Sequence, residues 1–470
     1  MIRSKMRLLI AFLSILNCLA LVSFSNKNKA REEFRKPNVI VIVADDLGYA
    51  DVGFNGSDIK TPNLDRLAGE GVRLEQFYTC PMCSPTRAGL LTGKYPLRFG
   101  LMRSVIPPQR EFGLPSDEET MAEMMEKAGY KYRGIIGKWH LGHRQQKWLP
   151  LNQGFTYHEG CYNGAVDYFD QKRDGERDWH QNFSVSQKQG YTTDLIGQAS
   201  VDFIKSVPTS DPFFLYVPFT APHSPFQAKE EDLKKYPDRN GVKRTYAAMV
   251  DCMDQNIGKI MDCLRERGQL ENTFIIFFSD NGGVEKAGDN GSLRGYKLTP
   301  YQGGINVAAA ACWIDGGISG GKTISSLMGY IDVLPTLSDA VGYNAGQKLD
   351  GKSVLNALQG HGAGTREWFT YLDQDGEKME QLAVINKNWK LIWRRNAPDN
   401  PTAFDKVELY DLSVDPFETT DLSEKKPELI LQLKTTINQF YGLKSKKQIP
   451  RYYEKEKLSG SVITDWQPVN

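Results

Sequence analysis

Two cysteines with C-x-x-C spacing, Cys80 and Cys83, lie in the segment TCPMCSPTRAGLLTG, residues 79–93. This spacing is typical of a redox dithiol or of one half of a structural zinc site. The zinc interpretation has little support, because the chain contains no second C-x-x-C and no histidine pair at zinc spacing. On spacing alone, the redox interpretation stays open.

The residues that follow Cys83 predict that this cysteine lies at the N-terminus of a helix. Pro85 suits the first turn of a helix, and Ser84 can cap it. Backbone N–H groups and the helix dipole favour an anion at such an end, and they also lower the pKa of a thiol. A redox pair gives no reason, however, for Arg87 or for Gly93 at the far end of the motif. The motif therefore needs an explanation beyond a dithiol.

Further residues suited to chemistry follow four apolar segments of the chain. These segments are NVIVIVADD (38–46), YRGIIGKWHLG (132–142), DPFFLYVPFTAPHSP (211–225) and NTFIIFFSDNGG (272–283). Each reads as a buried strand that ends in polar residues. Sites in α/β sheets form at the carboxyl ends of the strands, so we expect these side chains to meet: Asp45, Asp46, Lys138, His140, His223, Asp280 and Asn281.

Helical patterns alternate with these strands. Residues 61–71, 119–130 and 244–268 read as helices, and a glycine follows or ends each pattern. Strand–helix alternation predicts an α/β fold with a mostly parallel central sheet and helices on both faces. From about Thr365 the pattern changes to antiparallel strands (382–395 and 407–416) and one helix (426–443). We therefore predict a large domain over residues 35–364 and a smaller C-terminal α+β domain over residues 365–470.

Composition indicates a globular chain without a strong electrostatic preference. The 470 residues are 40% hydrophobic and 24% charged, with a net charge of +1, which gives no reason to expect nucleic acid as a partner. Basic residues precede an apolar run at 8–24, which predicts a signal peptide over residues 1–25 and a secreted or periplasmic protein. An uncleaved anchor helix is the alternative. We expect no membrane span in the mature chain, because the run is short and interrupted by polar residues.

Disulfides are possible in an exported protein, but the cysteines form no dense framework. Cys252 and Cys263 lie on one predicted helix, eleven residues apart. Eleven residues of helix span roughly 16 Å, too far for a bond between them. We expect both to be buried core residues.

Taken together, these motifs resemble the formylglycine-dependent sulfatase family. CSPTRAGLLTG matches its Cys-x-Pro-x-Arg…Thr-Gly motif, and GYKYRGIIGKWHLG (129–142) matches its second signature. The segments PNVIVIVADDLGYADVG, APHSP, SDNGG, LRGYKLTPYQGG and ELYDLSVDPFETTDL match further family motifs in order. The resemblance runs from about residue 37 to 422. It is nearest to the arylsulfatase B, or N-acetylgalactosamine-4-sulfatase, branch through LPLNQGF and YNGAVDYF.

The resemblance implies an alkaline-phosphatase-like large domain and a specific chemistry. A formylglycine-generating enzyme oxidises the motif cysteine, here Cys83, to formylglycine. One hydroxyl of the hydrated aldehyde attacks sulfur, and the second hydroxyl lets the sulfated intermediate collapse and release sulfate. This is covalent catalysis in two steps. On this interpretation Cys83 is a precursor, and Cys80 is a buried neighbour or a disulfide partner.

The family's residue roles carry over to matching positions. The implied ligands of one Ca²⁺ are Asp45, Asp46, Cys83, Asp280 and Asn281, consistent with a hard cation. Arg87 and Lys138 would stabilise the aldehyde hydrate, and His140 would assist collapse of the intermediate. Asp280 would take the proton of the attacking hydroxyl. His223 and Lys297 would bind sulfate, and one of them would protonate the leaving sugar oxygen.

The implied substrate is a sulfated oligo- or polysaccharide. The arylsulfatase B branch favours the 4-O-sulfate of galacto-configured sugars, as in chondroitin, dermatan or algal galactans such as carrageenan. We expect sugar contacts among six polar or aromatic residues that the core does not need: His143, Asn163, Asp167, Arg173, Trp179 and His180. Two alternatives remain, a phosphate-ester hydrolase of the same superfamily and a non-catalytic binder of sulfated glycans.

The chain also departs from the family pattern at a few positions. Gln302 stands where many relatives have Glu, and Asn306 stands where many have Arg. Tyr132 replaces a usual Ser or Thr, and Asp421 replaces a common Asn. The first two lie close in sequence to Lys297, so we expect them to mark altered substrate contacts.

Overall fold

The computed structural model describes residues 35–346, 348–362, 364, 366–373, 379–396 and 405–450. The predicted signal peptide and the end of the polar C-terminal tail lie outside these residues. The chain from Pro37 onward forms one compact unit. Within the described part of the chain, no helix is both long and apolar enough to cross a membrane.

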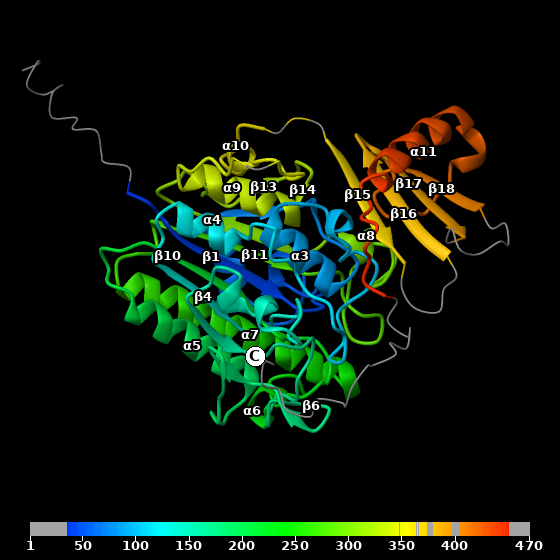
Figure 1. Ribbon diagram of the computed structural model, residues 1–470. Helices are drawn as coiled ribbons and strands as arrows, with labels where there is room; N and C mark the ends of the chain where they lie inside the picture. The colour runs from blue at the N-terminus through cyan, green and yellow to red at the C-terminus, as the bar shows by residue number, and fades with distance from the viewer. Residues whose placement is uncertain are drawn as a thin grey trace, which may run out of the picture. The chain divides into compact units, whose positions relative to one another are not determined.

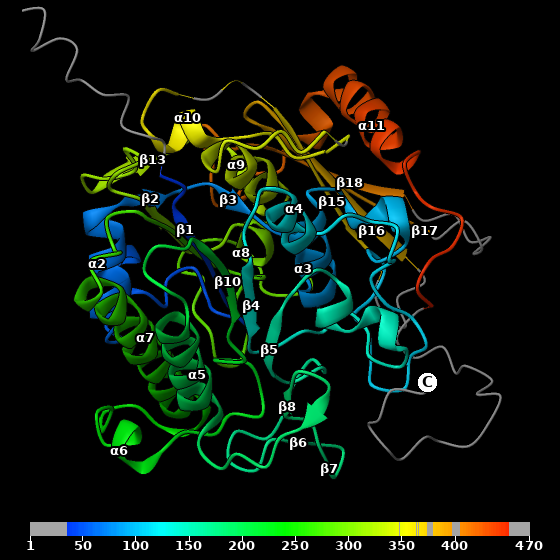
Figure 2. The same ribbon diagram turned by 60° about the vertical axis from the view of Figure 1, so that its left-hand side comes forward.

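A ten-stranded sheet forms the centre of this unit (Figures 1 and 2). Its middle strands are parallel neighbours: β11 (Thr273–Ser279), β1 (Asn38–Ala44), β10 (Phe213–Pro218), β4 (Tyr132–Ile136) and β5 (Tyr157–Gly160). Beyond β11 lie β12 (Ala309–Cys312), β2 (Val72–Leu74) and β13 (Lys322–Ile324), and beyond β5 lie β8 (His180–Gln181) and β9 (Ser184–Val185). The predicted strands and their mostly parallel arrangement are confirmed.

The sheet divides two hydrophobic cores, one on each face. Val39, Val41 and Val43 of β1 point into one core, and the alternate residues Ile40 and Ile42 point into the other. The first core is covered by α3 (Cys83–Thr92), α4 (Met121–Lys127) and α9 (Val333–Ala340), and the second by α2 (Pro62–Glu70), α5 (Thr192–Ser206) and α7 (Gly241–Glu266) (Figure 1). Both faces of β1 are thus buried, which explains its uninterrupted apolar sequence.

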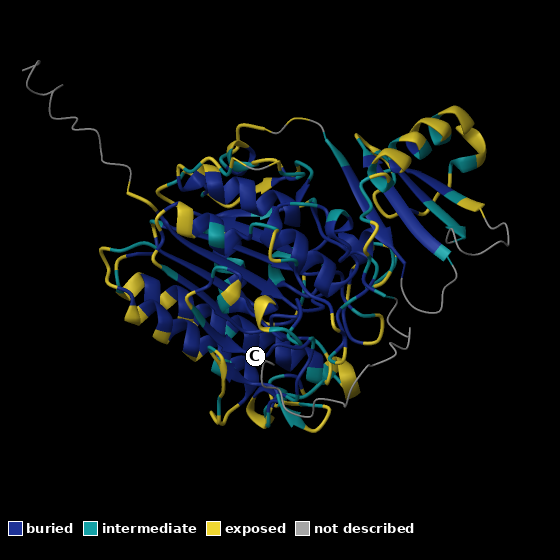
Figure 3. Cartoon of the chain, in the orientation of Figure 1, coloured by how far each residue is buried: buried dark blue, intermediate teal, exposed yellow. Residues whose placement is uncertain are grey.

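A second, antiparallel sheet follows in the C-terminal part of the chain. It runs in sequence order through β15 (Glu367–Leu372), β16 (Met379–Asn386), β17 (Trp389–Asn396) and β18 (Asp405–Asp411), and α11 (Pro427–Tyr441) contacts its two middle strands. Figure 3 shows exposed residues along the outer side of α11, whereas the central strands of the large sheet are buried. This arrangement matches the predicted smaller α+β region; the boundary at residue 365 stays a prediction.

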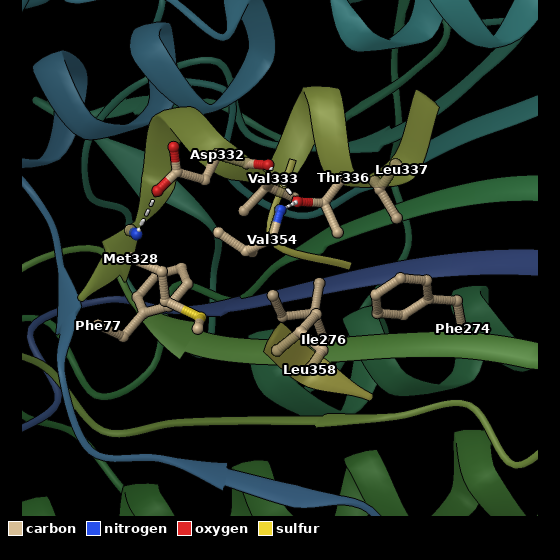
Figure 4. A pocket seen from close by; sticks show the side chains of 11 residues that line it. Phe77, Phe274, Ile276, Met328, Asp332, Val333, Thr336, Leu337, Val354 and Leu358 are labelled. Atoms are coloured by element: carbon tan, nitrogen blue, oxygen red, sulfur yellow. Dashed lines mark hydrogen bonds between the residues drawn. The ribbon is translucent and has the colours of Figure 1, made fainter. Parts of the chain in front are cut away.

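Shorter elements complete the fold. They are β3 (Phe77–Tyr78), β6 (Lys172–Arg173), β7 (Glu176–Arg177), α6 (Glu230–Leu233), α8 (Gln302–Ile305), β14 (Met328–Gly329) and α10 (Leu355–Leu358). Between β11 and α9 lies a cavity of about 10 Å³ with mostly apolar walls (Figure 4). Asp332 and Thr336 at its edge are hydrogen-bonded to the backbone N–H groups of Gly329 and Val354. The cavity is too small for a ligand larger than a water molecule.

Cysteine burial agrees with the sequence analysis. Cys252 and Cys263 are buried in the core around α7, as predicted. The six cysteines of the described residues are all free thiols, Cys80 among them. The Cys80 thiol lies 3.1 Å from the Tyr330 hydroxyl, so Cys80 is a buried neighbour of the motif and not a disulfide partner.

Candidate active site

Four neighbouring parallel strands bring the predicted polar residues to one edge of the large sheet. The spatial order β11, β1, β10, β4 places the carboxyl ends of these strands side by side. Asp280 and Asn281 follow β11, and Asp45 and Asp46 follow β1. His223 lies in the loop between β10 and α6, while Lys138 and His140 follow β4.

Helix α3 begins at Cys83 itself, and its N-cap residue is Met82. The prediction that Ser84 caps this helix is therefore wrong, although Pro85 does lie in the first turn. The Ser84 hydroxyl instead donates to the carbonyl of His140 at 2.9 Å. A buried hydroxyl needs a partner, and the adjacent β4 loop supplies one. Ser84 thus ties the start of α3 to the segment that carries His140.

Three buried acids and three cationic side chains pair off around Cys83. The guanidinium of Arg87 donates twice to one oxygen of Asp280, at 3.1 and 2.7 Å. The ammonium groups of two lysines complete the set: Lys138 lies 2.6 Å from Asp45, and Lys297 lies 2.6 Å from Asp46. Pairing of this kind compensates the cost of burying each charge.

The Cys83 thiol lies inside this set of charges. Its sulfur is 3.4 Å from Lys297 Nζ and 3.6 Å from Asp45 Oδ1. Burial, with a contribution from Asp280, raises the pKa of Cys83 to about 12. Burial likewise raises the pKa of Cys80 to about 12. Both thiols are therefore protonated near neutral pH, which argues against a reactive redox dithiol.

The two aspartates that follow β1, Asp45 and Asp46, differ in the direction in which their pKa values are shifted. Burial raises the pKa of Asp45 to about 7, against the opposing effect of Lys138. Burial also acts on Asp46, but Lys297, His223 and the Asn281 amide outweigh it and hold the pKa of Asp46 below its ordinary value. Asp46 has a φ of 68°, in the left-handed region, and its N–H lies 3.3 Å from Asp280 Oδ1.

The site is most accessible at His223 and Lys297. Their side chains are 19% and 14% exposed, whereas those of Arg87 and Lys138 are fully buried. His223 Nε2 lies 3.6 Å from Asp46 Oδ2, and its Nδ1 lies 2.5 Å from the carbonyl oxygen of Ser224. An incoming molecule would therefore meet these two side chains before it reached Cys83.

His140 is buried more deeply than His223 and Lys297. Its ring is buried, and its Nδ1 has no hydrogen-bond partner among the residues that the structure describes. Gly164 lies directly against this ring, since a Cβ at that position would come within 2.4 Å of His140 Cε1. Burial, reinforced by Lys138, holds the pKa of His140 well below its ordinary value, which favours the neutral ring.

The donor set fits a hard divalent cation. One ligand atom from each of Asp45, Asp46, Cys83 and His223 lies within 4.8 Å of the others. Asn281 offers a further oxygen, because its buried Oδ1 has no partner in the described ranges while its Nδ2 donates to Asp46 at 2.8 Å. Oxygen-rich sets of this kind suit Ca²⁺ or Mg²⁺. Asp280 is not part of that close group.

Three of the six predicted sugar contacts gather near one acid that the sequence analysis missed, Asp178. Its carboxylate accepts from the backbone N–H and side-chain Nδ2 of Asn163, both at 2.9 Å, and from the Tyr162 N–H at 2.9 Å. His180 Nε2 lies 3.1 Å from the Asp178 carboxylate. The negative charge of Asp178 also acts on the pKa of His143. The only sequence signal for Asp178 was its position directly before Trp179 and His180.

The other three predicted sugar contacts lie elsewhere. Trp179 is completely buried in the core beneath the sheet, so its ring offers no face to a sugar. Asp167 accepts from the N–H groups of Phe169 and Asp170 and so holds a turn. Arg173 lies in the β6–β7 hairpin, 3.5 Å from Asp174. Burial rules out Trp179 as a sugar contact, whereas Asp167 and Arg173, which are partly exposed, stay predictions.

The two departures near Lys297 are also structural. Gln302 and Asn306 are buried, at 3% and 6% exposure. The Gln302 N–H donates to Glu418 at 2.7 Å, and the Asn306 side chain bonds to the backbone of Phe77 and Glu75. The expectation that these two residues contact substrate is therefore wrong, because neither side chain reaches the open side of the site.

Comparison with known proteins identifies this architecture. The family model described as Sulfatase matches residues 37–343, about two thirds of the chain. The chain belongs to the sulfatase family. A second model, N-sulphoglucosamine sulphohydrolase, C-terminal, matches residues 311–442 of this sulfatase and covers the antiparallel sheet.

Named relatives agree with this assignment. The sulfatase is 30% identical to Arylsulfatase J of Mus musculus over 499 residues, covering 92% of this chain and 80% of the relative. It is 34% identical to N-acetylgalactosamine-6-sulfatase of Mus musculus over 351 residues, covering 68% and 66% of the two chains. The crystal structure of Ps i-CgsB in complex with k-i-k-neocarrahexaose superimposes with a TM-score of 0.80 at 30% identity, over 88% of this chain and 95% of that one.

These matches confirm the predicted family, the fold class and the reaction class. The sulfatase is a sulfuric ester hydrolase with the large sheet and smaller antiparallel sheet expected of it. The arylsulfatase B branch stays a prediction, since the relatives above carry other names.

Proposed function

We propose that this sulfatase hydrolyses a sulfate ester on a sulfated oligo- or polysaccharide, the 4-O-sulfate of a galacto-configured sugar. The observation that carries the proposal is the cluster of Arg87, Lys138 and Lys297 around Cys83, open to solvent mainly beside Lys297 and His223. Cations grouped at a half-buried opening suit a compact oxyanion. Relatives named for galactosamine sulfate and for a carrageenan oligosaccharide support a carbohydrate as the group that carries it.

Cys83 is the proposed precursor of the nucleophile. Its sulfur lies close to both Lys297 and Asp45, but as a thiol with a pKa of about 12 it is a poor nucleophile. Oxidation to formylglycine by a formylglycine-generating enzyme would supply a hydrated aldehyde oxygen instead. Lys138 and Arg87 are fixed beside this position through Asp45 and Asp280 and would stabilise that oxygen. Asp280 would accept its proton.

A calcium ion is the proposed metal. Asp45, Asp46, Asp280 and Asn281, with the modified Cys83, would hold it, and the buried free oxygen of Asn281 supports this assignment. When bound, the ion would act as a Lewis acid that polarises the sulfate group. The chain's own cations already neutralise the carboxylates in pairs, so Lys138 and Lys297 would share these oxygens with the metal.

The histidines and Lys297 complete the proposed chemistry. His223 and Lys297 are the accessible members of the site, so they are placed to bind sulfate and to protonate the leaving sugar oxygen. His140 is buried and favoured as the neutral ring, which suits a base that assists release of sulfate. Asn163, His180 and His143 are the proposed contacts on the sugar side. Asn163 and His180 are buried and bound to Asp178, so the half-buried His143 would meet the sugar first. Export through the N-terminal segment is part of the same proposal.

Sulfate release from defined oligosaccharides tests this function. The panel contains chondroitin-type and carrageenan-type 4-sulfates, 6-sulfates and an aryl sulfate, with formylglycine verified by mass spectrometry in the enzyme used. Cys83→Ser, verified by the same mass spectrometry to be unoxidised, is the matched control, since a serine lacks the second hydroxyl that lets the sulfated intermediate collapse. Release confined to a galacto-4-sulfate supports the proposal. Release from 6-sulfates alone refutes the position, and phosphate-ester turnover with unmodified Cys83 favours a phosphatase. Binding without release by enzyme that carries formylglycine favours a glycan-binding protein.

A further inference from the structure

One buried amide joins three segments that the active site needs to hold together. Asn290 is 2% exposed and lies in the loop between Asn281 and Lys297. It is not among the residues assigned to the site above. Its side chain reaches the segment after Asp46, the segment after Asn281 and the segment before Lys297.

Both polar atoms of the Asn290 side-chain amide are fully hydrogen-bonded. Oδ1 accepts from the backbone N–H groups of Tyr49 at 3.2 Å and Gly283 at 3.1 Å. Nδ2 donates to the carbonyl of Gly295 at 3.1 Å and, at a longer 3.5 Å, to that of Gly283. An asparagine amide has two donors and two acceptor positions, and here backbone groups occupy all four.

These bonds lead directly to Lys297. The carbonyl of Gly283 also accepts the Lys297 N–H at 3.1 Å, and Gly295 is two residues before this lysine. The next residue, Leu298, has a φ of 69° and donates its N–H to Pro81, close to Cys83, at 3.0 Å. The backbone on both sides of Lys297 is therefore tied to the rest of the site, and its Nζ is aimed at Asp46 and Cys83.

The loop that carries Asn290 is fixed in turn. Asp51, buried at 3% exposure, accepts from the N–H groups of Asp289 at 2.8 Å and Gly48 at 3.1 Å, and from the Tyr246 hydroxyl at 2.7 Å. The N–H of Ala50 donates to the Asp289 carbonyl at 2.9 Å. Asn290 consequently has a rigid base from which to hold the Lys297 segment.

We propose that Asn290 is a positioning residue that sets the distance between Lys297 and the Asp46–Cys83 side of the site. This inference rests on the proposed function, in which Lys297 binds the sulfate group. Asp in place of Asn keeps the size of the side chain but offers acceptors only, so a carboxylate oxygen would face the carbonyls of Gly295 and Gly283. That repulsion would move the Lys297 backbone, and a displacement of about 1 Å can cost on the order of 100-fold in rate.

The test introduces Asn290→Asp into two backgrounds, the full-length wild-type enzyme and Lys297→Ala. It measures kcat/KM on the sulfated oligosaccharide of the panel above from which the wild type releases sulfate fastest. If Asn290 acts through Lys297, Asn290→Asp lowers kcat/KM by about 10- to 100-fold in the wild type and by less than about 3-fold in the Lys297→Ala background. Equal losses in both backgrounds would overturn the proposal.

Asn256→Asp is the matched control, because Asn256 is a buried asparagine of α7 that also donates twice, to Asp194 and Cys252. It should leave kcat/KM within about 3-fold of the wild type; a loss as large as that of Asn290→Asp would also count against the proposal.

Hydrogen exchange gives a readout that does not need activity. Asn290→Asp should speed amide exchange in peptides covering residues 47–51 and 283–298, with peptides from α7 unchanged. Unchanged exchange in those two segments refutes the positioning role. If Asn290→Asp does not fold, Asn290→Ala removes the bonds without repulsion and is measured in the same way. A wild-type enzyme that releases no sulfate defeats the proposed function, while the exchange experiment still decides the role of Asn290.

Discussion

His158 makes the stability of this sulfatase depend on pH in a predictable way. The residue lies in β5, is completely buried, and finds no hydrogen-bond partner for either ring nitrogen in the described part of the chain. Its ring stacks on Tyr162 at 5.0 Å, and Tyr162 stacks on His180 at 4.0 Å. Burial, reinforced by His180, lowers the pKa of His158 to about 3 from an ordinary value of 6.5. The folded protein therefore keeps this ring neutral at pH values where the unfolded chain protonates it.

The sign and size of the effect follow from proton linkage. Between pH 6.5 and 3 the unfolded chain binds a proton that the folded protein does not, so the free energy of unfolding falls as the pH falls. At pH 5, about 1.5 pH units below the ordinary value, the loss is about 2 kcal/mol. His158→Phe keeps an aromatic ring of similar size and removes the titration. It should therefore change the stability little at pH 8, because neither ring nitrogen is hydrogen-bonded to a described residue.

Urea unfolding of wild type and His158→Phe at pH 8 and pH 5 measures this difference. The wild type should lose about 2 kcal/mol more than the variant between the two pH values. His361→Phe, at an exposed histidine, is the control and should follow the wild type. Equal pH dependence in wild type and His158→Phe would refute the reasoning, since it would mean that His158 is protonated in the folded protein or finds a partner that compensates for burial.

Three further predictions concern the metal and the C-terminal sheet. Calcium at 100 times its dissociation constant should stabilise EDTA-treated protein by about 2.7 kcal/mol in thermal unfolding, and Asp45→Asn should remove most of this gain; an undiminished gain would place the ion elsewhere. Lys390 and Glu418 form a fully buried ion pair at 2.6 Å, so Lys390→Met should lower the free energy of unfolding by about 3–5 kcal/mol in urea unfolding. Adding Glu418→Gln to the same chain should restore part of this loss. Additive losses from the two substitutions would contradict this coupling. Gln302 is 3% exposed, and its Oε1 has no partner among the described residues. Gln302→Glu would bury a carboxylate without a partner there and should cost roughly 2–3 kcal/mol in urea unfolding; unchanged stability would contradict this reasoning.

The strands and their polar ends were predictable because the signal was local. The apolar runs of β1 and β11 are long and uninterrupted, since both faces of these strands are buried, and each run ends in acids. Neighbouring parallel strands must bring their carboxyl ends to one edge, so Asp45 and Asp280 could be placed together before the structure was known. The motif around Cys83 likewise predicted a helix start at this residue and the family to which the chain belongs.

The partners of individual side chains could not be predicted in the same way. Ser84 has the right residue type and position for a helix cap, yet its hydroxyl bonds to the β4 loop, 56 residues further along the chain. Trp179 and His180 are adjacent in sequence, but one lies in the core and the other beside Asp178. Such choices depend on which distant backbone groups are left without partners once the sheet and loops are packed.

The sequence by itself determined the family and the reaction class, because a series of its motifs resembles those of sulfatases in order. It also determined the strand ends that carry the charged residues, because long apolar runs followed by polar residues are a local signal. Only the tertiary structure decided which side chains hold the site in shape. Asp178 and Asn290 have no motif of their own, and each acts by binding backbone groups of other loop segments. Their roles arise from the need of every buried N–H and carbonyl for a partner, and this need can be read only when the loops are folded against one another.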